Sequence, residues 1–217
     1  MRILLLGATG RTGKLVLEGA LNNGHRVNCL SRNSKRIKPQ DRLKIFEGSP
    51  KKKEDLEKAI LDCDAIISVL NISRNSDFPW APLRTPKNFL SNVMELLIPI
   101  AENRKVSRIS VCSAWGVSDS RNAIPKWFKW LIDNSNIAVA YKDHERQERI
   151  IMESKLDWTI VRPVGLTNSK NKEKIKESYG NKPKPSLLIS RKSVAEFLLE
   201  SLNRKDLLQK KVVISKE

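Results

Sequence analysis

Long hydrophobic runs are absent from this 217-residue sequence. The apolar run 3–6 ends at Gly7 and is far too short for a signal sequence or a membrane span. Cysteine is also scarce, and the three present lie far apart in or beside apolar runs, as small buried residues of a reducing compartment do: Cys29, Cys63 and Cys112. These absences argue against a disulfide framework and a metal site. We expect a soluble, cytoplasmic protein without membrane contact.

Negative charge is under-represented, because 41 Lys and Arg residues face 24 Asp and Glu residues, for a net charge of +17. Such a charge attracts phosphates of any kind, whether in nucleic acid, a nucleotide cofactor or an anionic membrane. The basic residues are spread along the chain, with local runs at 51–53 and 170–184, and form either a solvated surface or a binding patch. No nucleic-acid-binding motif accompanies them, so we expect no specific nucleic-acid partner.

Short apolar runs alternate with segments of helical periodicity along most of the chain. We expect strands at 2–6, 26–30, 43–46, 64–70, 107–112 and 157–162. We expect helices at 11–22, 53–61, 86–103 and 138–154. This alternation predicts an α/β fold with a doubly wound parallel sheet, the Rossmann fold, because right-handed crossovers place helices on both faces of the sheet.

The C-terminal part of the chain has weaker signals. Segment 168–185 is rich in lysine, asparagine and proline, which predicts an exposed and mobile excursion. A short strand at 187–189, an amphipathic helix at 193–202 and a last strand at 211–214 follow. The length predicts a single domain over 1–217, with a small substrate-side portion from about residue 163.

Three glycines, Gly7, Gly10 and Gly13, directly follow the first expected strand and open the first expected helix. Glycines in this position let the backbone approach a pyrophosphate closely, and the helix N-terminus favours its negative charge. A tight turn without a ligand would use the same spacing. A P-loop is excluded, because Ala8 stands where its first glycine belongs and Leu15 where its magnesium-binding Ser or Thr belongs.

The residue that follows the second expected strand distinguishes between nicotinamide cofactors. An acidic residue there accepts the ribose hydroxyls of NAD, whereas a cation suits the extra phosphate of NADP. This chain has Arg32 about 20 residues after the glycine turn, with Lys35 and Arg36 close behind. We therefore predict NADP(H) as the cofactor. The alternative, an ordinary surface arginine, applies to Arg32 and to Arg11.

Four stretches carry a family resemblance that spans nearly the whole chain: GATGRTG at 7–13, SRN at 31–33, SVCSAWG at 110–116 and TIVRP at 159–163. Together they resemble the atypical short-chain dehydrogenase/reductases. More narrowly, they are similar to the NAD(P)H-binding group that includes flavin reductase/biliverdin reductase B and the NmrA-like proteins. The resemblance implies a Rossmann domain that binds NAD(P) and is either a working reductase or a sensor of the nucleotide.

The resemblance also implies which residues contact the cofactor. The pyrophosphate loop would comprise Gly7, Thr9, Gly10, Arg11, Thr12 and Gly13, and the 2′-phosphate reader would be Arg32. The segment that passes the ribose would be Val69, Leu70 and Asn71. The segments beside the nicotinamide would be Cys112, Ser113 and Ala114, with Pro163, Val164 and Gly165 at its amide.

Two departures from the family pattern limit this transfer. Gly48-Ser49 stands where the family often has Gly-Asp, whose acid lies near the adenine. The Tyr-x-x-x-Lys pair of typical short-chain dehydrogenases is also missing, because Tyr141 is followed four residues later by Glu145. A glutamate would not lower the tyrosine pKa, so the sequence argues against alcohol dehydrogenation by that mechanism.

The chemistry that remains is hydride donation from NADPH to an acceptor that needs little help with protonation, such as a flavin or a quinone. The alternative is an NmrA-like sensor that binds NADP(H) without turnover. Ser113 lies at the carboxyl end of a strand, and His144 resembles a histidine near the substrate mouth of the flavin reductase relatives. Both are candidate catalytic residues. Alternatively, Ser113 bonds local backbone and His144 is a solvated helix residue.

Several aromatic residues fall in or beside loops that leave the carboxyl end of the expected sheet: Trp80, Trp115, Trp127, Phe128 and Trp130. Their flat rings would suit the stacking of an isoalloxazine or a quinone, although some could cover a core instead, as we expect of Trp158. The expected partner is thus a small aromatic acceptor, and the expected state is a monomer or a weak homodimer.

Overall fold

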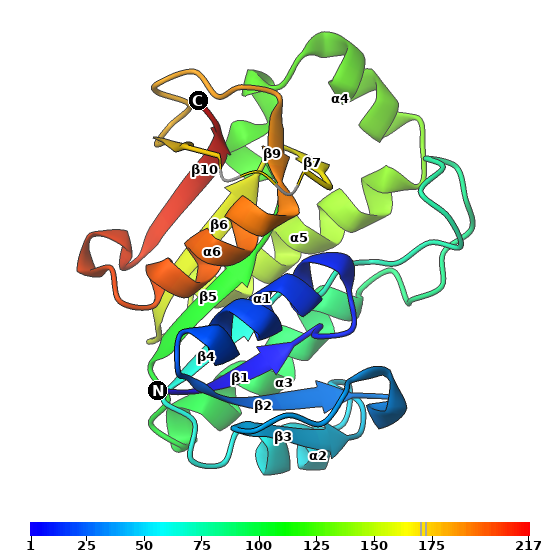
Figure 1. Ribbon diagram of the computed structural model, residues 1–217. Helices are drawn as coiled ribbons and strands as arrows, with labels where there is room; N and C mark the ends of the chain where they lie inside the picture. Colours follow the sequence, from blue (N-terminus) through cyan, green and yellow to red (C-terminus); the bar gives the residue numbers. More distant parts are fainter. Residues whose placement is uncertain (170, 172) are drawn as a thin grey trace.

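An eight-stranded sheet forms the centre of the computed structural model, which describes residues 1–169, 171 and 173–217 (Figure 1). In order across the sheet, its strands are β3 (Leu43–Glu47), β2 (Arg26–Ser31), β1 (Arg2–Leu6), β4 (Ala65–Ser68), β5 (Arg108–Cys112), β6 (Asp157–Pro163), β10 (Lys210–Lys216) and β8 (Ile175–Ser178). Neighbouring strands pair in parallel, except that β8 is antiparallel to β10. A separate small parallel pair joins β7 (Gly165–Thr167) to β9 (Leu188–Ser190).

Helices cover both faces of the sheet: α1 (Arg11–Asn22), α2 (Lys53–Ala59), α3 (Phe89–Asn103), α5 (Ile137–Met152) and α6 (Arg191–Ser201). Helix α4 (Lys126–Asp133) lies beyond the end of the sheet and contacts α5. Short 3-10 helices are η1 (Ser34–Arg36), η2 (Ser118–Ala123) and η3 (Lys205–Leu207). In the part of the chain that the structure describes, no helix has both the length and the apolar composition needed to cross a membrane.

The two faces of the sheet bury separate apolar cores, because successive side chains of a strand point to opposite sides. Leu5 packs with residues of α1 and α6, whereas Leu6 packs with residues of α2, α3 and α5. Strand β4 is buried at every residue and therefore reads as an uninterrupted apolar run rather than an alternating one. Each fully buried Leu or Ile contributes about 1.5–3 kcal/mol to this packing.

The strand order places a topological switch point between β1 and β4. The chain leaves β1 towards β2 on one side, and β4 joins the sheet on the other side. Ligands of open α/β sheets bind outside the carboxyl ends of the strands at such a point. The predicted doubly wound parallel sheet is confirmed, and the glycine turn that follows β1 lies at its switch point.

Some expected boundaries are wrong. Helix α3 begins at Phe89 and continues through Pro99. Helix α4 lies outside the four helices expected in this part of the chain. The excursion expected to be exposed and mobile contains β8, which pairs with β10 at the sheet edge, and Arg204 forms an ion pair with Glu177 there. Two of its residues lie outside the described part of the chain: Lys170 and Lys172.

Candidate cofactor and active site

The glycine turn between β1 and α1 folds so tightly that side chains would obstruct it. Gly7 has a φ of +92°, and a methyl group there would lie 2.9 Å from the carbonyl oxygen of Val69. A methyl group on Gly13 would lie 2.0 Å from the carbonyl oxygen of Gly7. The Gly10 N–H donates to the same oxygen over 3.0 Å. The turn therefore brings helix α1 directly against the end of β1.

The N-terminus of α1 remains open to an anion. Gly10 is its N-cap and supplies no side-chain hydrogen bond, and the first turn contains no acidic residue. The first N–H groups of the helix therefore keep their donor capacity, and the helix dipole adds partial positive charge at this end. Thr9 and Thr12 flank the turn and are half-buried. This arrangement fits the pyrophosphate of a dinucleotide.

Arg11, which the family resemblance places in the pyrophosphate loop, is held by an acid. Its Nη1 and Nη2 atoms donate to the two carboxylate oxygens of Asp77 over 2.8 and 2.7 Å. The hydrogen bond from Arg11 lowers the pKa of Asp77. Both side chains are largely exposed, so the pair is weak and can exchange with other partners.

Arg32 follows β2 and is exposed, and its side chain makes no hydrogen bond or ion pair with the described residues. The Asn33 side chain accepts from the Lys35 N–H and so caps η1. Glu47, opposite Ser31 on the neighbouring strand, accepts a hydrogen bond from Ser34. Glu47 is thus already hydrogen-bonded to Ser34, whereas Arg32 is exposed to solvent.

The end of β3 departs from the family pattern in a way that the structure makes concrete. The backbone N–H of Ser49 donates to Asp55 Oδ2 over 2.8 Å. A carboxylate therefore does lie beside the position where the family carries its acid, but it comes from α2 and binds the backbone. No sequence pattern indicated this contact, because Asp55 lies in the first turn of α2, six residues after Ser49.

The predicted ribose segment follows β4 beside the glycine turn. Val69 donates its N–H to the Leu6 carbonyl, and a methyl group on Gly7 would lie 3.2 Å from the Leu70 nitrogen. Asn71 is exposed just beyond. The structure thus brings the ribose segment and the pyrophosphate loop together.

Ser113 continues beyond β5 and is buried. Its N–H donates to the Val161 carbonyl over 2.7 Å, which keeps the segment parallel to β6. Its hydroxyl donates to Glu148 Oε1 over 2.6 Å. The alternative in which Ser113 satisfies local backbone with its side chain is therefore wrong. Its oxygen keeps the capacity to accept a hydrogen bond, but its one proton is committed to Glu148.

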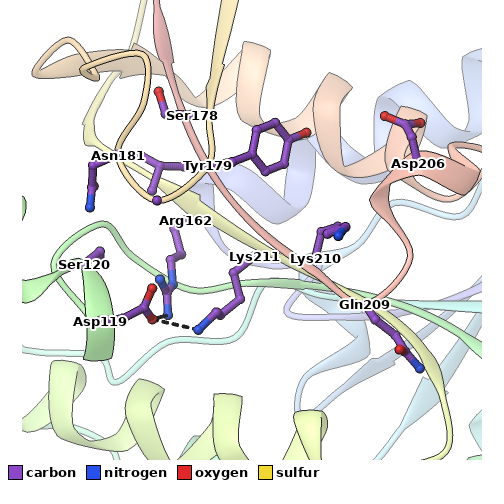
Figure 2. Close-up of a pocket in the computed structure, with 12 residues that line it drawn as sticks. Asp119, Ser120, Arg162, Ser178, Tyr179, Asn181, Asp206, Gln209, Lys210 and Lys211 are labelled. Atoms are coloured by element: carbon purple, nitrogen blue, oxygen red, sulfur yellow. Dashed lines mark hydrogen bonds and ion pairs between the residues drawn. The ribbon is translucent and has the colours of Figure 1, made fainter.

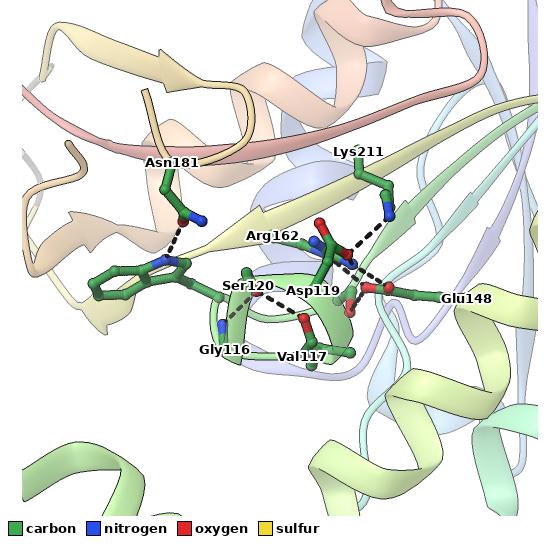
Figure 3. Close-up of polar contacts among 10 residues, drawn as sticks. Gly116, Val117, Asp119, Ser120, Glu148, Arg162, Asn181 and Lys211 are labelled. Carbon is green, nitrogen blue, oxygen red and sulfur yellow. Dashed lines mark hydrogen bonds and ion pairs between the residues drawn. The ribbon is translucent and has the colours of Figure 1, made fainter. Parts of the chain in front are cut away.

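Beneath Ser113 lies an ion-pair network that joins α5, β6, η2 and β10 (Figure 3). Glu148 and Arg162 are only 1% and 2% exposed, and the Nε of Arg162 donates to Glu148 Oε1 over 2.9 Å. Arg162 Nη2 also donates to Asp119 over 2.9 Å, and Asp119 accepts from Lys211 over 2.8 Å.

The network fixes the charge of its members. Burial opposes ionisation of Asp119, but the hydrogen bonds from Arg162 and Lys211 outweigh it and hold the pKa of Asp119 at about 2. Burial alone would lower the pKa of Arg162, but its hydrogen bond to Glu148 outweighs burial and raises that pKa. Arg162 therefore stays charged while buried, and its charge depends on both acids.

A cavity of about 570 Å³ adjoins this network between η2 and the β8–β10 pair (Figure 2). Its charged lining residues are Asp119, Arg162, Asp206, Lys210 and Lys211. The glycine turn does not line it, so the cavity lies on the β10 side of the ion-pair network.

On α5, the side chain of His144 is buried and that of Tyr141 is half-buried. His144 is 4% exposed, so the alternative of a solvated helix residue is wrong. Its Nδ1 lies 3.0 Å from Gln147 Oε1, and burial lowers the pKa of His144 despite that bond, which leaves the imidazole neutral at pH 7. The hydroxyl of Tyr141 donates to the Trp115 carbonyl, and burial raises the pKa of Tyr141.

A protein-family model described as NAD(P)H-binding matches residues 7–205, which include the glycine turn, Arg32 and Ser113. The chain belongs to this NAD(P)H-binding family. The predicted NAD(P)H-binding group is thereby confirmed. The fold is also that of solved short-chain dehydrogenase/reductases, as the resemblance implied.

Several solved structures share the fold of this chain. A short-chain dehydrogenase/reductase from Veillonella parvula in complex with NADP is 18% identical, with a TM-score of 0.81 over 99% of this chain and 94% of that chain. The oxidoreductase ylbE from Lactococcus lactis is 19% identical, with a TM-score of 0.80 over 100% and 91%. ChuY, an anaerobillin reductase from Escherichia coli O157:H7, is 21% identical, with a TM-score of 0.81 over 100% and 97%.

Proposed function

We propose that this NAD(P)H-binding protein is an NADPH-dependent reductase that transfers hydride to a planar aromatic acceptor of the flavin or quinone type. One observation carries the proposal. The glycine turn, which a single methyl group would block, and the exposed Arg32 follow the carboxyl ends of the neighbouring strands β1 and β2. The family match and the NADP complex of the Veillonella relative support it.

Two features would bind and orient NADPH. The N–H groups of the first turn of α1 would donate to the pyrophosphate, and Arg32 would supply charge to the 2′-phosphate. Glu47 is bonded to Ser34 and so does not compete as a reader of ribose hydroxyls. These contacts favour NADPH over NADH.

The bound cofactor would supply the hydride, while the chain would hold it and exclude water. Ser113 would accept a hydrogen bond at its oxygen, because its own proton is donated to Glu148. His144 is neutral and buried, so it has no direct exchange of protons with solvent. An acceptor whose reduced form takes its proton from water suits this site, and flavins and quinones meet that requirement.

A sensor function is the second candidate, and the same two residues favour it. Because Ser113 and His144 offer no proton that exchanges freely with water, a protein that binds NADPH and changes its interaction with a partner is consistent with the site. The reductase named among the related structures favours turnover instead.

Oxidation of NADPH by the purified protein, measured with FMN, with a quinone and with no acceptor, separates the two functions. Acceptor-dependent loss of the reduced-nicotinamide absorbance supports the reductase. Tight NADPH binding without turnover on either acceptor supports the sensor. Failure to bind NADPH or NADH at all contradicts both.

Cofactor choice is tested with Arg32→Ala and with Arg26→Ala, another exposed arginine at the opposite end of β2, as the control. A hydrogen bond between charged groups contributes about 1.5–3 kcal/mol, so Arg32→Ala should weaken NADPH binding by about 10- to 150-fold. NADH binding should be unchanged. Equal losses for both cofactors would mean that Arg32 does not read the 2′-phosphate.

A further inference from the structure

Helix α4 exposes its tryptophans to solvent. Trp127 and Trp130 are 62% and 60% exposed, and their spacing of three residues places them on one face of the helix. The opposite face anchors α4 to the protein, because Ile132 is buried and Phe128 packs edge-on against Tyr141. Large aromatic side chains normally bury their area, so an exposed pair indicates a surface that binds something.

The loop before α3 extends this surface. Trp80 Nε1 donates to the Asn134 carbonyl at the end of α4 over 2.6 Å, and Asn136 Nδ2 donates back to the Trp80 carbonyl over 2.9 Å. The rings of Trp80 and Phe78 lie 5.2 Å apart, and both are exposed. We call this set the aromatic face: Phe78, Trp80, Trp127 and Trp130.

The charge that surrounds the aromatic face is positive. Lys126 and Lys129 are exposed on α4 and form no ion pair with the described residues. The two acids of these segments are already neutralised, because Asp77 pairs with Arg11 and Asp133 pairs with Arg121. The chain as a whole carries a net charge of +17.

We infer that the aromatic face, with Lys126 and Lys129, docks the protein on the surface of an anionic lipid bilayer, with α4 lying in the interface. Helices bound in this way combine lysines with exposed tryptophan and phenylalanine, whose rings favour the headgroup region. An anionic bilayer matches the charge of this surface, whereas a second copy of so basic a chain would bring like charges together. This docking differs from the sequence-based expectation of no membrane contact and does not depend on the proposed reductase function.

Co-sedimentation with vesicles tests the docking without any nucleotide. The protein should bind vesicles of phosphatidylcholine and phosphatidylglycerol, bind pure phosphatidylcholine weakly, and lose binding as salt rises. The variant Trp127→Ser/Trp130→Ser should lose about tenfold in binding for each tryptophan removed. The variant Lys126→Gln/Lys129→Gln should lose about fivefold for each lysine.

A matched control separates docking from diffuse charge. Lys51→Gln/Lys52→Gln removes the same charge from exposed residues next to α2, at the end of the molecule away from α4 (Figure 1). The control should bind vesicles like the wild type, and thermal unfolding should show that all variants fold.

Three outcomes would overturn the proposal. They are no binding to anionic vesicles, an equal loss in the Lys51→Gln/Lys52→Gln control, and a stable wild-type dimer that Trp127→Ser/Trp130→Ser dissociates. The last outcome would identify the aromatic face as a contact between two copies of the chain.

Discussion

Replacing Glu148 with glutamine tests the ion-pair network beneath Ser113. Glutamine keeps the shape of the side chain and removes the charge that two nitrogen atoms of Arg162 contact. Arg162 is 2% exposed, so it cannot recover hydration, and Asp119 would remain as its charged partner. Removing one partner of a buried ion pair costs about 3–5 kcal/mol of folding stability. Because Arg162 keeps its contact with Asp119, we expect Glu148→Gln to cost about 3 kcal/mol, the lower end of that range.

The surface pair of Arg204 and Glu177 provides the matched control. Glu177 also accepts from two nitrogen atoms of an arginine, but both side chains are partly exposed, and Arg204 also pairs with Asp206. Glu177→Gln should therefore cost about 1 kcal/mol or less. The two substitutions change the same atoms and differ mainly in burial.

Urea unfolding followed by circular dichroism measures both effects. With a denaturant slope of about 3 kcal/mol per molar, Glu148→Gln should lower the midpoint by about 1 M and Glu177→Gln by about 0.3 M or less. Equal shifts would refute the argument, because they would show that burial does not set the strength of the Glu148–Arg162 pair.

Three further predictions follow from the structure. Gly13→Ala should destabilise the fold by about 1–3 kcal/mol or more and abolish NADPH binding, whereas a methyl group on Gly10 meets only one atom, at 3.3 Å, and should leave thermal stability nearly unchanged. Asp119→Asn should cost about 1 kcal/mol or less at neutral pH; because the folded pKa is about 2 and the ordinary value is 3.8, this difference should vanish as unfolding is repeated from pH 4 down to pH 2. Burial raises the pKa of the Cys29 and Cys63 thiols to about 12, so a disulfide reagent at pH 8 should modify them only after unfolding.

Much of the fold could be predicted from the sequence, because local signals determine it. The strand–glycine–helix order at Gly7 to Gly13 reflects contacts made within a few residues. The uninterrupted apolar run of β4 reflects burial of the strand on both faces. Their alternation is sufficient to identify a doubly wound sheet. The C-terminal part of the chain, where the sequence signals are weak, was harder to predict. Strand β8 has few apolar residues and depends on its pairing with β10.

The interior of the candidate site could not be predicted in the same way. Glu148 lies in a stretch of α5 rich in charged residues, where nothing distinguishes a buried acid from a solvated one. Glu148 can be buried because its charge is paired with Arg162, which is also buried and lies on β6, the strand that faces α5. Only the folded chain brings these charges together, because partners 14 residues apart across two elements leave no periodic signal.

The ion-pair network also constrains the chemistry of the site. If Ser113 donated its proton to an acceptor, Glu148 would lose the hydrogen bond that the hydroxyl now provides. Its carboxylate accepts one hydrogen bond from Ser113 and two from Arg162, so loss of the Ser113 donor would remove one charge-assisted hydrogen bond, at a cost of about 1.5–3 kcal/mol. That cost opposes proton donation by Ser113, so in the proposed reaction the proton would come from water. The site is therefore suited to acceptors whose reduced form takes its proton from water. The proposed flavin and quinone classes have this property.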